Sequence, residues 1–250
     1  MIQKSAAQKL VVVQAKLYLR EPMGVFFTLL FAPLLLVVMG LIFGNEPQPV
    51  FGGHGQLDIY VPMYAAIVIG MVGLTTIPIE ASARRDAGVL RRFRATPLRP
   101  LTYIVSDVLV YFVMILLGIF LLFAIGMGIY GVQFDGNPLA LLAGISLSAA
   151  AFLTLGYIIA SVSPNTRIAT VIGNVLLIPM MMLSGITLPL EMMPETVRQV
   201  ARFIPLTHVA TLLRGLWFGE PIGQHMTEIV VLGGILIVGM VVAARTFRWE

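Results

Sequence analysis

The sequence contains no cysteine and few charged residues. Only 11% of its 250 residues are Asp, Glu, Lys or Arg, whereas hydrophobic residues make up 58%. Without cysteine, the chain can form no disulfide framework, no cysteine-ligated zinc site and no thiol chemistry. A soluble domain is about one quarter charged, so this composition excludes an ordinary soluble protein and indicates an integral membrane protein.

Ionisable side chains are also missing from the centres of the long apolar runs. Ion-coupled transporters and proton relays place such groups near mid-membrane, and many channels carry a charged ring, so both classes are disfavoured. The sequence has no nucleotide-binding P-loop and no His-Glu-x-x-His motif. We therefore expect no catalytic residue, no metal site and no cofactor in this chain, and any ATP hydrolysis must occur on another polypeptide.

Uncharged apolar runs predict six membrane-spanning helices. Each long run can form a helix of about 20 residues, the length that crosses roughly 30 Å of hydrocarbon. The runs are continuously apolar, without the alternation typical of a membrane β-barrel. The predicted spans are 23–43, 59–79, 108–130, 138–161, 168–189 and 227–244. The expected fold is a single all-α integral membrane domain over residues 1–250.

The basic residues divide unequally between the two sides of these spans. Three of the sixteen Lys and Arg residues, Arg198, Arg202 and Arg214, fall between spans five and six, and the others fall on the opposite side. The positive-inside rule then predicts that both termini are cytoplasmic. This topology accounts for the basic composition, so no nucleic-acid partner is needed.

Residues 1–21 precede the first span and have a helical pattern. Ile2, Ala6, Leu10, Val13 and Leu17 follow helical spacing, while basic residues occupy another face. This pattern favours an interfacial helix that lies flat on the membrane. The alternative is a basic flank that only sets topology.

The segment 83–100 carries six arginines in a chain with few charges elsewhere. Asp86 can begin a short helix that Pro97 ends. Apolar Val89, Leu90 and Phe93 share one face of that helix, with arginines beside it. Such a helix suits docking into a groove on another protein, but the arginines could equally serve topology and bind anionic lipid headgroups.

The segment between spans five and six predicts two short helices. Pro194 and Glu195 are placed to start the first helix, and Thr207 can cap the second. Helices this short and amphipathic could dip into the outer leaflet if their ends are buried in protein or wetted. The alternative is a small extracellular cap with no transport role.

Two segments resemble a known family. Residues 80–103, EASARRDAGVLRRFRATPLRPLTY, are similar to the cytoplasmic loop of ABC-2 type permeases, the membrane subunits of drug-resistance and polysaccharide-export ABC transporters. Residues 184–219, SGITLPLEMMPETVRQVARFIPLTHVATLLRGLWFG, are similar to the family's outside segment. The two segments occur in the family's order, on its expected sides and with its spacing.

This resemblance implies a set of parts and partners. Residues 83–96 would be a coupling helix on an ATP-binding subunit, residues 1–21 a connecting helix, and residues 184–224 a re-entrant segment. The transporter would contain two ATP-binding subunits, which carry ATP and Mg, and a second permease as homodimer or heterodimer, in the inner membrane of a prokaryote. The implied contacts with the ATPase are Asp86, Gly88, Val89, Leu90, Arg91, Arg92 and Phe93.

Polar and aromatic residues within the spans are candidates for a substrate path. These are Phe27, Thr75, Thr76, Thr170 and Asn174. For Asn174, a helix–helix hydrogen bond is at least as good an interpretation. An apolar path predicts export of an amphipathic or lipid-like cargo such as a drug, a lipid or a glycan-lipid. The alternatives are a non-transport scaffold that binds anionic lipid and, less favoured, a secondary transporter.

Overall fold

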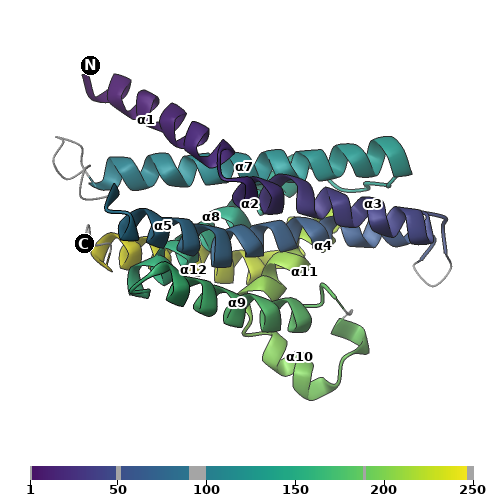
Figure 1. Cartoon of the computed structure of the whole chain (residues 1–250). Helices are drawn as coiled ribbons and strands as arrows, with labels where there is room; N and C mark the ends of the chain where they lie inside the picture. Colours follow the sequence, from purple (N-terminus) through teal and green to yellow (C-terminus); the bar gives the residue numbers. More distant parts are fainter. Residues whose placement is uncertain (1, 49–51, 90–99, 188–189, 247–250) are drawn as a thin grey trace.

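All regular structure in residues 2–48, 52–89, 100–187 and 190–246, the part that the computed structural model describes, is helical (Figure 1). The chain begins with α1 (Ile2–Leu19), α2 (Pro22–Val25), η1 (Phe26–Leu30) and α3 (Phe31–Phe43). It continues through α4 (Gln56–Met71), η3 (Val72–Thr76), α5 (Ile77–Asp86), α7 (Pro100–Tyr130), α8 (Pro138–Val162) and α9 (Thr166–Leu183). It ends with η4 (Leu190–Met192), α10 (Glu195–Ala201), α11 (Pro205–Trp217), η5 (Ile222–His225) and α12 (Met226–Thr246).

The prediction of an all-helical protein with six spans is confirmed. Six helices in the described part of the chain are long and apolar enough to cross a membrane. They are Pro22–Phe43, Gln56–Asp86, Thr102–Tyr130, Pro138–Val162, Thr166–Leu183 and Ile222–Val242. Each overlaps one predicted span, because the length and hydropathy of a segment decide whether it can cross the hydrocarbon core as a helix.

The second span, α4–η3–α5, lies at the centre of the bundle. In an apolar stretch of 18 residues of this span, 83% of the residues are buried, whereas only 17% are buried in the corresponding stretches of the fifth and sixth spans. Its α4 part contacts α3, α7 and α11, and its α5 part contacts α8 and α9. Any movement of this span therefore has to be accommodated by most of the other helices.

Neighbouring helices approach two π-helical turns, η1 and η3, through glycine. A Cβ atom on Gly118 of α7 would lie 2.2 Å from the Thr28 carbonyl oxygen of η1. A Cβ atom on Gly173 of α9 would lie 2.3 Å from the Leu74 carbonyl oxygen of η3. Since such contacts are too short for any side chain, glycine is what allows α7 and α9 to pack directly on the widened turns.

Both ends of the described chain lie at one end of the bundle, on the left in Figure 1, which we call the proximal end. The opposite end is the distal end. At the proximal end, α5 continues to Asp86, beyond the predicted end of span two at residue 79, and α7 starts at Pro100, before the predicted start at 108. Charged residues were expected to end these spans, but the helices continue because those charges pair inside the protein.

At the distal end, Asp58 joins the loops that flank three spans. Its buried carboxylate accepts hydrogen bonds from Asn45 Nδ2 (2.9 Å), Gly55 N (2.8 Å) and Gln133 N (3.0 Å). The fifth span ends nearby at Leu183, earlier than the predicted residue 189, with a glycine at φ +84° two residues later. That left-handed conformation is a common helix end.

Two helices form between spans five and six, as predicted. Pro194 precedes α10, where Glu195 pairs with Arg198 at 2.5 Å. The expected cap Thr207 is wrong: Ile204 is the N-cap of α11, so Thr207 lies inside that helix. Most of α11 is buried against α4, α8, α9 and α12, an unusual position for a segment that joins two spans.

Helix α1 packs on α7 through one stripe of residues. Leu10, Gln14 and Tyr18, spaced four apart, are all buried. Val13 and Leu17, which the sequence pattern grouped with Leu10, are about half exposed. The apolar residues of α1 are therefore divided between a protein-facing stripe and an outward face.

Candidate functional site

A buried ion-pair cluster lies at the proximal end of the second span. Arg84 of α5 donates to Asp107 Oδ1 of α7 at 2.6 Å and to Glu80 Oε2, one turn earlier, at 3.0 Å. The hydroxyl of Tyr111 donates to Glu80 Oε2 and that of Tyr157, from α8, to Asp107 Oδ2, both at 2.6 Å. The cluster thus links α5, α7 and α8.

Burial makes this cluster sensitive to the loss of any one partner. The side chains of Arg84, Glu80 and Asp107 are 17%, 14% and 3% exposed. Taking charges out of water is costly, and the pairs are maintained only when hydrogen bonds satisfy the groups that remain. The tyrosine hydroxyls supply those bonds.

The next residue, Arg85, binds the end of α8. Its guanidinium donates to the carbonyl oxygen of Ala160 at 3.2 Å and to that of Ser163. Carbonyls in the last turn of a helix have no partner within the helix and carry its partial negative charge. Arg85 satisfies one of them, that of Ala160, together with the carbonyl of the C-cap residue Ser163, so the end of α8 is fastened to α5.

Asp86, the residue after that, binds the start of α9. Its Oδ2 accepts hydrogen bonds from Thr166 N at 2.9 Å and from Thr166 Oγ1 at 2.7 Å. A carboxylate is favoured at this position because the first amide groups of a helix are unpaired donors. The expectation that Asp86 begins its own helix is wrong, since it is the last residue of α5 and caps a different helix.

Arg84, Arg85 and Asp86 together form what we call the clasp. Each of these three consecutive residues bonds to a different span: α7, α8 and α9, respectively. Gly88 follows with φ +68°, and its amide donates to the Arg85 carbonyl at 2.9 Å, which ends α5.

The N-terminal helix reaches the same cluster. The hydroxyl of Tyr18 donates to Thr28 Oγ1 at 2.5 Å, and its ring meets that of Tyr111 edge to face at 5.4 Å. Burial raises the pKa of Tyr18, so its hydroxyl stays a donor. Gln14 Nε2 donates to the carbonyl of Tyr103, a residue whose hydroxyl accepts from Arg84 at 3.3 Å.

The predicted ATPase-contact residues fall partly inside the described structure. Asp86 belongs to the clasp, while Gly88 and Val89 follow α5 directly. Leu90, Arg91, Arg92 and Phe93 lie outside the described residues. The proposed coupling segment 83–96 therefore begins as the last turn of the second span.

Two of the helices that carry predicted path residues are in direct contact. Gly173 of α9 approaches η3 so closely that its Cβ atom would lie 3.3 Å from Thr75 Cα. This contact brings the helix turn of Asn174 beside that of Thr75 and Thr76. Asn174 is exposed and Thr76 is buried.

The other predicted path residues have local partners. The hydroxyls of Thr75 and Thr170 donate to carbonyls one turn earlier, those of Met71 (2.6 Å) and Thr166 (2.9 Å). Phe27 lies in η1, whose main neighbours are α2, α3, α4 and α7. The structure therefore groups the four polar candidates around η3 and α9, and places Phe27 in a different part of the bundle.

The sequence allows an ion pair between Glu80 or Asp86 and a nearby arginine, but it does not identify the residues that complete the ion-pair cluster. Asp107 and the tyrosines of the cluster were treated as ends or members of spans. The available signal was the four-residue spacing of Glu80 and Arg84 at the edge of an apolar run. Their partners in α7 and α8 follow only from how the helices pack.

Comparison with known proteins places the chain in a family. Residues 6–218 match the family described as ABC-2 type transporter. Nodulation protein J of Rhizobium leguminosarum bv. viciae is 29% identical over 42% of this chain and 40% of its own length. In Escherichia coli K12, the inner membrane transport permease YhhJ is 23% identical over 72% of this chain, and the probable multidrug ABC transporter permease YbhS is 20% identical over 76%.

This chain spans about half the length of the two Escherichia coli relatives. The family match nevertheless covers most of its own residues and all but the last of its spans. The six apolar helices and the inner-membrane relative agree on a multi-pass inner membrane protein. The chain belongs to the ABC-2 type transporter family, as a membrane subunit.

Proposed function

We propose that this chain is the permease subunit of an ATP-driven exporter and moves an amphipathic or lipid-like cargo out of the cytoplasm or the inner leaflet. The observation that carries the proposal is the clasp. A force applied to the loop after Asp86 reaches α7, α8 and α9 through hydrogen bonds made by three adjacent residues. A scaffold that only bound lipid through its arginines would not need this connection.

The proposed partners are ATP-binding subunits, inferred from the family and from the arginine-rich segment 83–96. Permeases of this family imply an ATP-binding subunit, and this sequence contains no P-loop motif. We place two ATP-binding subunits, which carry ATP and Mg, against the segment 83–96, with Leu90 and Phe93 as the apolar contact. Helix α1, which touches the same cluster, is the proposed connecting helix.

The proximal end is proposed to be cytoplasmic. Arg84, Arg85 and Arg167 lie there, next to the arginine-rich loop, whereas Arg198 and Arg202 belong to the segment between spans five and six. An excess of Lys and Arg is typical of cytoplasmic loops. Both termini would then be cytoplasmic, and α10, α11 and the distal loops would face outward.

The cargo path is proposed to run beside α9 and η3. Only 17% of the fifth span is buried, so its exposed face, which includes Asn174, is available to a second permease subunit. An interface there would enclose the polar groups near η3. Leu206, at the start of α11, meets Gly70 near the middle of the second span, which supports a re-entrant arrangement of α11.

The cargo class is inferred from the residues that are proposed to line the path. The path residues Thr75, Thr76, Thr170 and Asn174 carry no fixed charge. A drug, a lipid or a glycan-lipid suits such a path better than a small ion, whose transport usually requires ionisable groups at this depth. One relative is described as a probable multidrug ABC transporter permease, which supports a drug as one candidate cargo.

The test is purification of the complex through this chain from its native membrane after mild crosslinking. ATPase activity and the identity of co-purifying subunits are measured for the wild type and for the double change Leu90→Glu, Phe93→Glu. We expect an ATP-binding subunit with the wild type and its loss with the double change, because two carboxylates would disrupt an apolar docking surface.

A matched control is available at the distal end. Val200→Glu with Phe203→Glu has the same chemistry and the same three-residue spacing, and both side chains are more than half exposed. This variant should retain the ATPase. If no ATPase co-purifies with the wild type, or if both double changes lose it equally, the coupling proposal is wrong and a lipid-binding scaffold becomes the better interpretation.

A further inference from the structure

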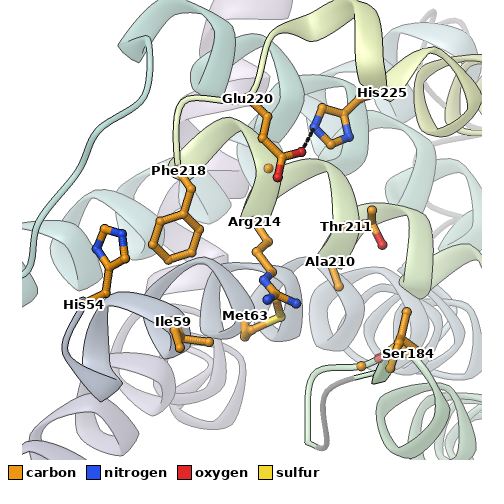
Figure 2. Close-up of a pocket in the computed structure, with 13 residues that line it drawn as sticks. His54, Ile59, Met63, Ser184, Ala210, Thr211, Arg214, Phe218, Glu220 and His225 are labelled. Atoms are coloured by element: carbon orange, nitrogen blue, oxygen red, sulfur yellow. Dashed lines mark ion pairs between the residues drawn. The ribbon is translucent and has the colours of Figure 1, made fainter. Parts of the chain in front are cut away.

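A pocket of about 530 Å³ lies at the distal end, between α4 and α11. Helix α4 contributes Ile59 and Met63 to its lining, and α11 contributes Thr211. The short segment that follows α11 carries Glu220 and His225, and Figure 2 shows these two side chains together on one side of the pocket. The contacts of this segment therefore decide whether that side of the pocket is shut.

The His225 ring lies between two carboxylates. Its Nε2 is 3.0 Å from Glu220 Oε2, marked by the dashed line in Figure 2, and its Nδ1 is 3.8 Å from Glu228 Oε2. Only 4% of His225 is exposed, so the ring faces protein groups and not bulk water. Glu220 follows α11, His225 ends η5 and Glu228 lies in the first turn of α12, so the ring can join three consecutive segments.

Gly215 of α11 makes room for this arrangement. A Cβ atom there would lie 2.1 Å from His225 Nε2 and 2.8 Å from Glu220 Oε2. Glycine weakens the interior of a helix relative to alanine, so its presence needs a packing reason, and the close approach of His225 and Glu220 is that reason. The ring is consequently seated against α11 and does not merely lie in a loop.

A carboxylate on each side of the ring makes the charge of His225 decisive. In a neutral imidazole one nitrogen donates an N–H and the other carries a lone pair, whereas a carboxylate only accepts. A neutral His225 can therefore serve only one of the two carboxylates, and its lone pair then faces the other. The imidazolium donates at both nitrogens.

The hydrogen bonding of the described residues fits a site that needs a proton. Within the described part of the chain, neither His225 Nε2 nor Glu228 Oε2 makes a hydrogen bond of regular geometry, although both atoms are buried. Buried polar groups are normally hydrogen-bonded. A second proton on the ring would give both carboxylates a donor after a small movement of the side chains.

Other charged groups surround the pocket. Arg214 of α11 lines it and is already engaged within the protein. At another edge, His54 Nδ1 is 3.8 Å from Asp58 Oδ2 and 4.0 Å from Asp135 Oδ2. With the two carboxylates at His225, the described residues around these two rings carry more negative than positive charge, and a bound proton reduces their mutual repulsion.

We propose that His225 is a proton-operated latch that holds the segment after α11 against the start of α12. With the proton bound, the ring bonds to Glu220 and Glu228 together and this side of the pocket is shut; without it, one of the two contacts is lost. Histidine changes charge between about pH 5 and 8, so the latch is closed at the acidic end of that range and released as the pH rises through it.

The latch goes beyond the exporter proposal, because its closure requires neither ATP nor a partner and is measured on the chain alone. The distal end is proposed to face outward, so the latch would respond to the pH outside the inner membrane. Its test does not depend on that orientation.

Hydrogen exchange of the detergent-purified full chain, followed by mass spectrometry at about pH 6 and about pH 8, tests the latch. After correction for the intrinsic pH dependence of amide exchange, amides of residues 220–230 in the wild type should exchange at least about tenfold more slowly at the lower pH, the size of one hydrogen bond to a charged group. His225→Gln should abolish this difference. Glu228→Gln should also abolish it, because its amide can donate to a neutral ring and no proton is needed.

His208→Gln is the matched control, because His208 lies in α11 and its Nε2 is 2.9 Å from the carbonyl oxygen of Arg202, not from a carboxylate. This variant should keep the wild-type difference. Any effect of His54 is read separately, in the amides of residues 52–58. If His225→Gln does not fold, Glu228→Gln carries the test alone. Equal corrected exchange of the wild type at the two pH values would overturn the proposal, as would an unchanged difference in either latch variant or its loss in the control.

Discussion

Replacement of Arg84 by methionine should strongly destabilise the fold. The change leaves the carboxylates of Glu80 and Asp107 buried, 14% and 3% exposed, without their cation. Removal of one partner from a buried pair costs about 3–5 kcal/mol. For a chain of this size each kcal/mol lowers the midpoint of thermal unfolding by about 2–4 °C, so a decrease of about 6–20 °C is expected. Thermal unfolding in detergent at a fixed scan rate measures it.

The control removes the charges together. Glu80→Gln, Arg84→Met and Asp107→Asn in one chain leave no unpaired ion, so most of the lost midpoint should return. Arg84→Lys keeps the charge, but lysine lacks the planar guanidinium that reaches two carboxylates at once. Its midpoint of thermal unfolding should therefore lie between those of the wild type and Arg84→Met. The reasoning is refuted if Arg84→Met lowers the midpoint by less than about 2 °C, or if the triple change is as unstable as the single one.

Three further changes test the fold and the clasp. Asp86→Ala removes both hydrogen bonds to Thr166, so it should weaken the start of α9 by about 1 kcal/mol, speed hydrogen exchange in its first turn and reduce cargo-stimulated ATPase activity; unchanged exchange would contradict this role. Gly173→Ala should destabilise the α9–η3 contact by about 1–3 kcal/mol, whereas Gly234→Ala in α12, where no atom lies within 4 Å of the added Cβ, should be neutral or stabilising in the same thermal assay. Asp58→Asn turns one of the two carboxylate oxygens, which together accept three hydrogen bonds, into a donor and should cost about 1–3 kcal/mol in that assay; an unchanged midpoint would argue against the role of Asp58 in joining the distal loops.

The boundaries of the spans show where sequence interpretation stops being sufficient. Charged residues were expected to mark the ends of spans two and three, yet α5 continues through Glu80 and Arg84, and α7 includes Asp107. Each charge is accommodated by a partner on another helix, 23 residues away in the case of Arg84 and Asp107. A hydropathy pattern contains no information about such a partner.

The position of α11 is a second example. Arg214 and His225 were assigned to an outside segment, and α11 was expected as a short amphipathic helix. That most of α11 is buried follows from its contacts with α4, α8, α9 and α12. These contacts depend on how the segment between spans five and six folds back into the bundle.

The sequence by itself determined the membrane class, the number and order of the spans, the absence of a nucleotide-binding motif and the family to which the chain belongs. These properties depend on hydropathy, segment length and local motifs, which are all set along the chain. Only the tertiary structure decided that Arg84, Arg85 and Asp86 hold three different spans and that α11 is buried against four other helices. Such contacts require side chains from distant segments to meet, and packing of the helices around the second span is what brings them together.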